Sequence, residues 1–262
     1  MVAPLASVVV PSLNGAHLLP ECLDSLARQS YANLEVIVAD GASTDATQDL
    51  LARAYPDVRL LRLRRNAGFA GNVNAGLRAA RGEMLCLFNN DARAEPDWVE
   101  VCVETLVANP AIGSVASKVL FADARTINSA GDVFCRDGAA RQRGAGEPDG
   151  PRWNQLEHVF GAMGGAAAYR RAMLADVGLL DEAFFMYLED VDLAFRAQLL
   201  GWACLYQPLA CVYHRGSASG GGKLASFYNG RNLIRLLAKD LPAGLVPRML
   251  PAILGYQARR AR

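Results

Sequence analysis

The sequence predicts an α/β fold built on a doubly wound, mostly parallel sheet. Short apolar, β-branched runs alternate with amphipathic runs of helical period from residue 7 to about residue 108. The apolar runs are typical of buried strands, and each is followed by glycine, asparagine or aspartate. Strands that alternate with helices form parallel layers, and ligands of such sheets bind beyond the carboxyl ends of the strands.

The first elements follow this alternation closely. "SVVVPSLNG" predicts a strand that ends in a loop at Pro11, Asn14 and Gly15, and "LLPECLDSLARQS" predicts a helix. "LEVIVADGASTD" predicts a second strand that stops at Asp40 and Gly41. "TQDLLARAY" and "VRLLRL" then predict a helix and a third strand.

A Gly- and Asn-rich loop, "RNAGFAGNVNAGLRAA", feeds the next helix, and "MLCLFNNDAR" predicts a fourth strand. "WVEVCVETLVANP" is another amphipathic helix. The four strands exit at Asn14, Asp40, Asn66 and Asp91. Because the carboxyl ends of parallel strands meet at one edge of a sheet, we expect these polar side chains to form a site.

The pattern loosens after this point. Residues 135–158 are rich in Gly, Pro and Arg and have no period, so they predict a mobile surface loop, with a lid, an acceptor loop and a plain linker all open. "GAMGGAAAYRRAMLADVG" returns to order as small residues followed by a helix. "DVDLAFRAQLLGW" predicts a helix that Gly201 stops.

The composition excludes several classes of protein. The 262 residues are 52% apolar and 20% charged, which fits a globular protein and not a disordered one. A net charge of +1 gives no global field for nucleic acid, so no nucleic-acid partner is expected. Six cysteines in no CxxC pair indicate buried thiols of a reducing compartment. With no signal peptide and no apolar span, the chain is expected in the cytoplasm.

The helix start near residue 190 carries three acids in an apolar setting, "FFMYLEDVDLAF". Carboxylates are rarely fully buried without a partner. A helix N-terminus favours negative charge, so Asp192 is expected to act as a cap. Capping does not account for Glu189 and Asp190, which makes them candidates for chemistry.

"NND" (residues 89–91) ends the fourth strand with groups that suit a hard cation. Mg²⁺ and Mn²⁺ take carboxylate ligands and bridge to phosphates of a substrate. His214, in "VYHRGS", would add an imidazole, which Mn²⁺ accepts, although a structural histidine is an equal reading.

The order of segments resembles the inverting glycosyltransferases of family 2, which have the GT-A fold. The matching stretches run in family order from residue 7 to about residue 237: "VVVPSLNG", "VIVADGASTDAT", "RNAGFAGNVNAGL", "LFNNDARAEPDWV", "GGAAAYRRAMLADVGLLDEAFFMYLEDVDLAFRAQLLGW", "VYHRGS" and "FYNGRNLIRLL". The set is most similar to bacterial rhamnosyltransferase-like enzymes. It implies one catalytic domain over 1–237, with a nucleotide-sugar half (1–118) and an acceptor half (119–237).

The resemblance implies a donor site at the sheet edge. Asp40 would accept from the base of a UDP- or dTDP-sugar, with Pro11 and Asn14 lining the base and ribose pocket. The other implied donor contacts are Asn66, Gly68 and Phe69 around sugar and diphosphate, Asn90 in the "NND" motif, and Arg231 near the phosphates, where a structural ion pair is an equal reading.

The resemblance also implies the catalytic groups. "NND" occupies the family's DxD position, but Asn89 replaces its first acid, so Asp91 and His214 are the implied ligands of Mg²⁺ or Mn²⁺. Asp190 would be the general base and Glu189 its acidic neighbour. The base would take the proton of an acceptor hydroxyl as the hydroxyl attacks the anomeric carbon and inverts it. The implied acceptor is a glycan or a lipid-linked sugar in cell-surface polysaccharide synthesis.

Three alternatives belong to other functional classes. A non-catalytic nucleotide-sugar-binding subunit of the same fold stays open because Asn89 departs from the usual acid. A sugar-phosphate nucleotidyltransferase would need a Gly-rich N-terminal signature with Arg and Lys, which "PSLNGAHLLPE" lacks. A dehydrogenase would need a GxGxxG turn after the first strand, which is also missing.

The C-terminal part is basic. Residues 231–262 carry a net charge of +6, which leaves −5 for the rest of the chain. Segment 238–262 mixes Leu, Ile and Met with arginine, a pattern that suits short helices lying on an anionic leaflet. Pro242, Pro247 and Pro251 are expected to break it into two or three pieces, and packing against the catalytic domain is an equal reading.

Overall fold

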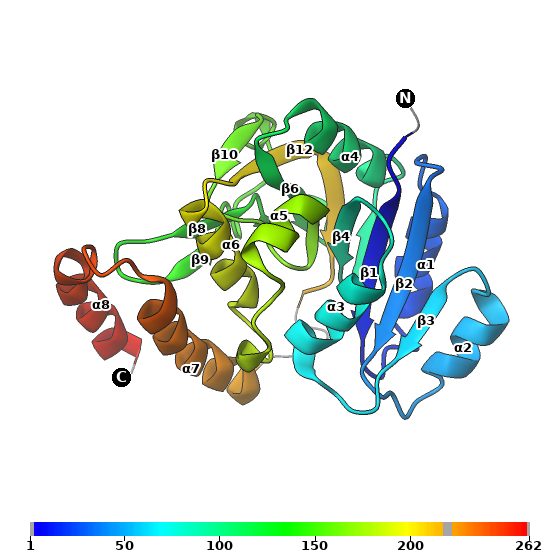
Figure 1. The fold of residues 1–262 in the computed structure, drawn as a ribbon, viewed down its shortest axis with the longest axis horizontal. Coiled ribbons are helices and arrows are strands. Elements are labelled where there is room, and N and C mark those ends of the chain that lie inside the picture. Colours follow the sequence, from blue (N-terminus) through cyan, green and yellow to red (C-terminus); the bar gives the residue numbers. More distant parts are fainter. Residues whose placement is uncertain (1–2, 217–221, 261–262) are drawn as a thin grey trace.

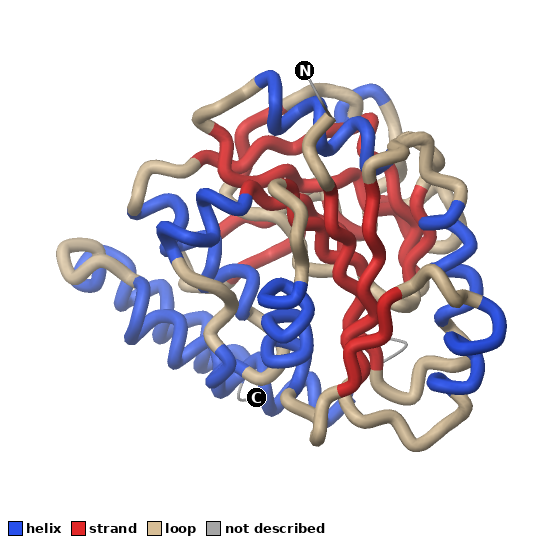
Figure 2. The backbone as a smooth tube through the Cα atoms, turned by 45° about the vertical axis from the view of Figure 1, so that its right-hand side comes forward, coloured by secondary structure: helices blue, strands red, loops and turns tan. Residues whose placement is uncertain are grey.

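The computed structural model describes residues 3–216 and 222–260. One large sheet runs through the molecule with helices on both faces, and the last two helices lie together at one end (Figures 1 and 2). The order of the main path is β10-β12-β6-β11-β4-β1-β2-β3.

The N-terminal half is a parallel layer, as predicted. Its strands and helices are β1 (Ala6–Ser12), α1 (Leu19–Ala27), β2 (Leu34–Asp40), α2 (Thr47–Ala54), β3 (Arg59–Arg62), α3 (Gly68–Ala79) and β4 (Met84–Phe88). Strand β1 pairs with both β2 and β4, with Val8 opposite Val36 and Cys86. The sheet therefore extends from β1 in both directions, to β2 and β3 on one side and to β4 on the other. A crevice opens at this reversal of strand order, beyond the carboxyl ends of β1 and β4.

The second half makes the sheet mixed. Its elements are β5 (Ala92–Ala94), α4 (Trp98–Ala108), β6 (Ile112–Phe121), β7 (Ile127–Ser129), β10 (Glu157–Val159), β11 (Ala166–Arg170), α5 (Arg171–Val177), α6 (Glu189–Leu199) and β12 (Ala203–His214). Strand β11 lies antiparallel between β4 and β6, and β12 runs parallel to β6. The expectation of a mostly parallel sheet holds for β1 to β4, and antiparallel pairs dominate the rest.

Alternate residues of the central strands bury against different helices. Val8 and Val10 pack with α1 and α4, whereas Val9 packs with α3, α5 and α6. A third, smaller core joins α6 to α7 (Gly222–Asp240) through Phe184, Val191, Phe195, Leu233 and Leu236. Burial on both faces is why the strands read as continuous apolar runs in the sequence.

The segment 135–158 is ordered, contrary to the prediction of a mobile loop. It contains β9 (Ala140–Gln142), which pairs with β8 (Asp132–Phe134), the single turn η1 (Pro151–Trp153) and the start of β10. Trp153 is buried, and Arg143 lies over its ring while pairing with Glu157. Strands of three residues are too short to show a period, so a search for periodicity misses them.

The C-terminal segment forms two helices. Helix α7 covers Gly222–Asp240, and the predicted domain boundary between 237 and 238 falls inside it. Helix α8 covers Val246–Arg260 and contains Pro251, so only the region around Pro242 interrupts the helical structure. Residues 261 and 262 lie outside the described residues. Over the described parts of the chain, every helix is too short or too polar to cross a membrane.

Candidate active site

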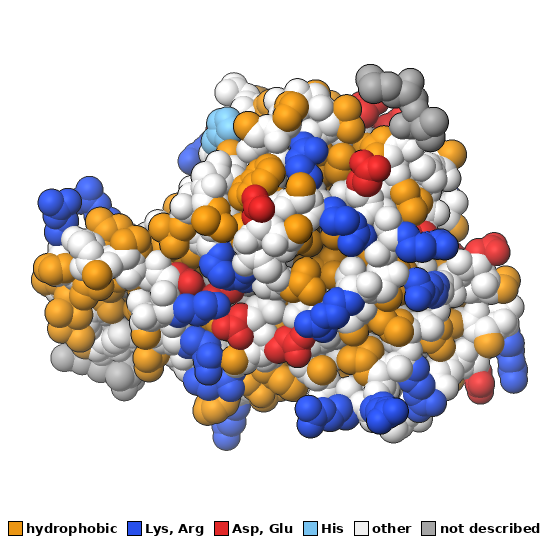
Figure 3. All heavy atoms as spheres, in the orientation of Figure 1, with side chains coloured by type: hydrophobic (Ala, Val, Ile, Leu, Met, Phe, Trp, Pro, Cys, Tyr) orange, Lys and Arg blue, Asp and Glu red, His pale blue; other side chains and the backbone are white. Residues whose placement is uncertain are grey.

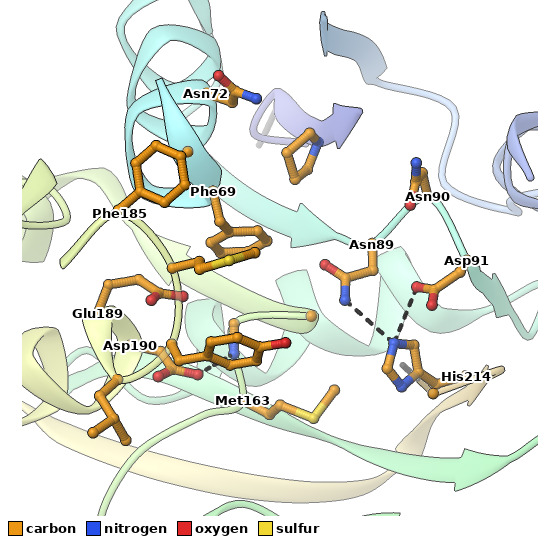
Figure 4. Close-up of a pocket in the computed structure, with 18 of the residues that line it drawn as sticks. Phe69, Asn72, Asn89, Asn90, Asp91, Met163, Phe185, Glu189, Asp190 and His214 are labelled. Carbon is orange, nitrogen blue, oxygen red and sulfur yellow. Dashed lines mark hydrogen bonds and ion pairs between the residues drawn. The ribbon is translucent and has the colours of Figure 1, made fainter. Parts of the chain in front are cut away.

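A cavity of about 810 Å³ opens at the predicted edge of the sheet. It lies beyond the carboxyl ends of β1 and β4, between α3, the start of α6 and the end of β12 (Figure 4). All but two of the predicted site residues line it: Pro11, Asn14, Asn66, Gly68, Phe69, Asn90, Asp91, Glu189, Asp190 and His214. Segments far apart in the chain thus meet in one cavity, as the sequence predicted.

Asp40 is one of the two exceptions. Its side chain is fully buried, and it accepts hydrogen bonds from the amide (3.2 Å) and the hydroxyl of Ser43. The Ser43 hydroxyl oxygen also accepts from the amide of Asn14 at 2.8 Å. Asp40 therefore holds the loop after β2 in place beside the cavity, and its contact with a nucleotide base stays a prediction.

Arg231 is the other exception. Its guanidinium donates to the carbonyl oxygens of Ala183 (3.0 Å) and Phe184 (2.7 Å) and lies 4.8 Å from the ring centre of Tyr228. These contacts differ from the two alternatives read from the sequence, a phosphate contact and an ion pair. A role at the phosphates stays a prediction, while the observed role is to hold the chain that leads into α6.

Gly68 shapes the wall around Phe69. Its φ is 75°, and a Cβ atom there would lie 2.4 Å from the carbonyl oxygen of Phe185. Asn66 accepts a hydrogen bond from the Gly68 amide at 2.9 Å, which fixes the turn that starts α3. Glycine adopts this backbone without strain, and only glycine leaves room for the close approach. The turn places Phe69 in the cavity beside the glycines at 164 and 165.

Asp91 and His214, the two predicted metal ligands, lie next to each other. Strand β12 ends at His214, which is paired in register with Ala92 of β5, so its side chain comes next to Asp91. His214 Nε2 lies 3.0 Å from Asp91 Oδ1 and 3.3 Å from Asn89 Nδ2 (Figure 4). On the other side of the ring, Nδ1 lies 2.9 Å from Asn128 Oδ1.

These contacts fit a divalent cation. An amide oxygen only accepts, so Nδ1 of His214 donates to Asn128, and Nε2 is the ring nitrogen that faces the carboxylate of Asp91. Nε2 and the carboxylate oxygen, 3.0 Å apart, need a proton or a cation between them. Within residues 3–216 and 222–260 no group of three or more His, Cys, Asp and Glu could hold a metal. The pair therefore supplies two ligands, and phosphate and water would supply the others.

The three acids of "LEDVD" have separate roles. Asp190 accepts hydrogen bonds from the Gly164 amide through Oδ2 and from the Val191 amide through Oδ1, both at 2.9 Å. Burial raises the pKa of Asp190, despite these two amides. Burial and the charge of Asp190 raise the pKa of Glu189 well above its usual range. Both acids line the cavity.

Asp192 points away from the cavity. The prediction that Asp192 caps the helix is wrong, because the cap residue is Leu188 and no side chain caps α6. Its fully buried carboxylate pairs with Arg196 at 2.7 Å and with Lys239 of α7. The apolar stretch therefore carries three acids because two face the cavity and one anchors α6 to its neighbours.

The chain before α6 has an unusual backbone. Phe185, Tyr187 and Leu188 have φ values of 66°, 69° and 67°, which non-glycine residues rarely adopt. Asn232 of α7 donates from one amide nitrogen to the carbonyl oxygens of Phe184, Met186 and Tyr187 at 3.0, 2.8 and 2.7 Å. We call residues 184–188 the pre-helix turn. Its residues present Glu189 and Asp190 to the cavity.

Sequence reasoning missed several lining residues. Asn128 and Gly164 act on His214 and Asp190 through hydrogen bonds, and Asp132 lies in the cavity wall. Asn232, outside the cavity lining, stands next to Arg231 in "YNGRN" and acts through the carbonyl groups of the pre-helix turn. None of these residues is marked by spacing, because each acts on a segment distant in sequence.

Known proteins are similar to this chain in sequence. The family model of glycosyl transferase family 2 matches residues 7–178. The N-acetylglucosaminyl-diphospho-decaprenol L-rhamnosyltransferase of Mycobacterium tuberculosis is 30% identical over 85% of this chain and 79% of its own length. The succinoglycan biosynthesis protein ExoO of Rhizobium meliloti is 32% identical over 80% of this chain and 61% of its own length. The chain spans only 25% of an uncharacterized Sinorhizobium fredii protein that is 29% identical to it.

Solved structures share the fold. A mannosyltransferase from Pyrobaculum calidifontis, in complex with GDP-Man and Mn²⁺, superposes with a TM-score of 0.66 at 23% identity, over 96% of this chain and 69% of that one. GalNAc-T7, with UDP, GalNAc and Mn²⁺, gives a TM-score of 0.71 at 15% identity, over 90% of this chain and 48% of that one. Together with the family match, these similarities show that the chain belongs to glycosyl transferase family 2 and has the GT-A fold.

Proposed function

We propose that this chain is an inverting glycosyltransferase that moves a sugar from a UDP- or dTDP-sugar to a hydroxyl group of a glycan or lipid-linked acceptor. The observation that carries the proposal is the pairing of two features in one cavity. A buried carboxylate, Asp190, is held by backbone amides on one wall, and the Asp91–His214 pair stands on another (Figure 4). The first feature suits a base, and the second suits the diphosphate end of a donor.

The reaction is one displacement. Asp190 accepts the proton of the acceptor hydroxyl while the hydroxyl oxygen bonds to the anomeric carbon and the bond from that carbon to the diphosphate breaks, with the electron pair leaving on the phosphate oxygen. The raised pKa of Asp190 makes it a stronger base than an exposed aspartate. The amides of Gly164 and Val191 fix both carboxylate oxygens, so the base keeps its orientation.

Asp91 and His214 would hold Mg²⁺ or Mn²⁺, and Asn128 would orient the imidazole. When bound, the cation supplies positive charge beside the leaving diphosphate. Mn²⁺ is present in the two solved structures named above, which supports a divalent ion without choosing between the two. The imidazole ligand favours Mn²⁺.

The relatives guide the choice of substrates. The mycobacterial relative is named for transfer of L-rhamnose to a decaprenol-linked N-acetylglucosamine, and ExoO for succinoglycan synthesis. By analogy, we propose that this chain acts in assembly of a cell-surface polysaccharide, with rhamnose as the first donor sugar to test. Its place of work would be the cytoplasm, at the inner face of the cell membrane.

A nucleotide-release assay tests the activity. The protein is incubated with Mn²⁺ and a panel of dTDP-rhamnose, UDP-glucose, UDP-N-acetylglucosamine and GDP-mannose, with and without a pool of methyl glycosides as acceptors. We expect release from one pyrimidine donor, stimulated by an acceptor and abolished by EDTA. Thermal stabilisation by a donor without any release or transfer would show a non-catalytic binder instead.

The proposed membrane contact is the segment 238–262, most of which forms α8. Helix α8 exposes Val246, Leu250 and Leu254, which are spaced four residues apart and so share one face. Basic side chains accompany hydrophobic surface at this end of the molecule (Figure 3). Apolar side chains next to Arg and Lys suit an anionic leaflet, where a lipid-linked acceptor would lie.

Co-sedimentation with vesicles tests this contact. We expect binding to phosphatidylglycerol-containing vesicles and little binding to pure phosphatidylcholine. Val246→Ser combined with Leu250→Ser and Leu254→Ser should release the protein. Leu199→Ser, at an exposed apolar residue of α6, is the matched control. Equal partitioning of all forms would rule out this surface.

A further inference from the structure

A third acid lines the cavity beside the base. Asp132 opens strand β8, and its backbone amide donates to the carbonyl oxygen of Gly161 at 2.8 Å. Only 5% of the residue is exposed, although it belongs to the cavity wall with Glu189 and Asp190. The mechanism above gives Asp132 no part.

Within the described residues, the carboxyl group of Asp132 and one carboxyl oxygen of Glu189 are buried without a hydrogen-bond partner. The carboxyl group of Asp132 makes no hydrogen bond or ion pair with any residue in 3–216 or 222–260. Oε2 of Glu189, which is also 5% exposed, has no hydrogen-bond partner in the same described parts of the chain. Buried polar groups are normally hydrogen-bonded, so these two are expected to find their partners in a ligand.

Nearby basic side chains are already paired elsewhere. Arg196 and Lys239 bind Asp192 behind the first turn of α6. Arg141 lines the cavity, but its guanidinium forms two hydrogen bonds with Asp137, at 3.0 and 2.5 Å. These three basic side chains are therefore committed to other carboxylates, so they offer no counter-charge to an anionic group at the wall around Asp190.

The hydroxyl groups of a ligand would suit the hydrogen-bonding groups of this wall. A hydroxyl donates to a carboxylate and also accepts from a protonated carboxyl, and a sugar ring carries several hydroxyls on adjacent carbons. Burial, and then the charge of Asp190, raises the pKa of Asp132 well above its usual range, so a neutral ligand suits it better than a cation. A simple lipid alcohol, which has a single hydroxyl, would leave Asp132 and Glu189 without partners.

We propose that Asp132 and Glu189 form the acceptor subsite, which takes a neutral sugar unit through hydroxyls adjacent to the one that Asp190 deprotonates. The inference deepens the proposed function and rests on it. It assigns the acceptor to a class: a sugar with at least two neighbouring free hydroxyls. It also assigns Asp132 a role in acceptor specificity.

Acceptor kinetics test this assignment. The donor identified by the release assay is used with methyl glycosides of N-acetylglucosamine, glucose and rhamnose, and with farnesyl phosphate as an anionic lipid acceptor. We expect transfer to a glycoside and none to farnesyl phosphate. Asp132→Ala should raise the acceptor KM about 2- to 10-fold, the range of a hydrogen bond between neutral groups. The affinity for free UDP or dTDP should stay unchanged.

Deoxy acceptors separate binding from folding. For the wild-type enzyme, removing the hydroxyl next to the attacked one should raise KM by about the same factor as Asp132→Ala. For Asp132→Ala, the same removal should cause no further loss. Asp132→Asn, which keeps the shape, checks that folding survives, and Asp49→Asn, at an exposed aspartate of α2, is the matched control.

The outcomes are distinguishable. If the wild-type chain transfers sugar but Asp132→Ala keeps its acceptor KM, or if farnesyl phosphate is the better acceptor, the acceptor subsite is wrong while the proposed function stands. If the wild-type chain binds no nucleotide sugar, the proposed function fails, and the acceptor subsite fails with it.

Discussion

Asp190, the proposed base, is held in an environment that suits proton transfer. Its two oxygens accept from different backbone amides, so its orientation does not depend on other side chains. Burial works against these amides and keeps its pKa raised. The result is a carboxylate that is fixed in space and is still basic enough to accept a proton.

Asp190→Asn tests this role. The amide side chain has the same shape but cannot accept a proton from the acceptor, so we expect transfer to slow about 100- to 10,000-fold. Binding of UDP or dTDP, measured by titration calorimetry, should be unchanged. Asp57→Asn, at an exposed aspartate in a turn, is the control. A near-normal transfer rate in Asp190→Asn would mean that another group is the base.

The sequence was informative about residues with chemistry and less so about their supports. Asp91, Asp190 and His214 were placed in one site from motif order, and the structure brings them to one cavity. The prediction of a helix cap at Asp192 is wrong because the carboxylate binds Lys239, which lies 47 residues away in the sequence. Local spacing reveals a partner such as Arg196 four residues on, but it does not reveal contacts between distant helices.

At the scale of elements, helix α7 supports the pre-helix turn. Three residues of this turn have positive φ, a costly backbone for non-glycine residues. Asn232 and Arg231 bind its carbonyl groups, and α7 also contributes Leu233 and Leu236 to the core it shares with α6. Helix α7 thereby fixes the direction in which α6 presents its first residues.

Asn232→Ala should therefore destabilise the protein. The carbonyl groups of residues 184, 186 and 187 would lose a buried donor, with an expected cost of about 2 to 4 kcal/mol in the free energy of unfolding. Asn229→Ala on the same helix removes only a bond to Ala225 within α7 and should cost much less. Urea denaturation measures both. Equal losses would show that the carbonyl contacts of Asn232 add no stability.

Packing of α3 on β1 gives a second prediction for an element. A Cβ atom at Gly76 would lie 2.3 Å from Cγ1 of Val9 in the middle of β1. Gly76→Ala should push the helix away from the sheet and lower the unfolding free energy by about 1 to 3 kcal/mol.

Gly230→Ala is the matched control for this prediction. No described atom lies within 4 Å of a Cβ at Gly230 of α7, so alanine should stabilise that helix by about 0.5 to 1 kcal/mol. Thermal denaturation of the two variants should therefore shift in opposite directions. Shifts of the same sign would contradict the packing argument.

Elements were predictable where they are long and apolar. Strands β1, β2 and β4 and helix α4 follow from their periods. Strands β8, β9 and β10 have three residues each, and β10 pairs with the distant β12, so their sequences resemble a loop. Asp132 lies on one of these short strands, which explains why its place in the cavity was not foreseen.

At the scale of the whole molecule, a buried ionic cluster joins α6 to α7. Asp192 binds Arg196 and Lys239, and Lys239 also binds Asp181 at 2.9 Å. Asp240 is buried beside them. Burial, followed by the charge of Asp192 and a hydrogen bond with it, raises the pKa of Asp240 to about 7, although Lys239 and Arg196 oppose the rise.

The stability of the whole fold should depend on pH through these acids. Below about pH 4 the carboxyl of Asp240 is protonated in both the folded and the unfolded chain. Between that pH and about 7 the folded chain keeps the proton and the unfolded chain has lost it. Stability therefore falls as pH rises through this window. The raised pKa values of Asp132 and Glu189 act in the same direction.

Melting curves of the metal-free protein between pH 5 and 8 test this linkage. We expect the melting temperature to fall as the pH rises, and Asp240→Asn to flatten the slope because its side chain cannot ionise. Asp97→Asn, at an exposed position before α4, should leave the slope unchanged. A slope that stays the same in Asp240→Asn would place the proton elsewhere, because only a group that titrates differently in the folded and unfolded chains can make stability depend on pH.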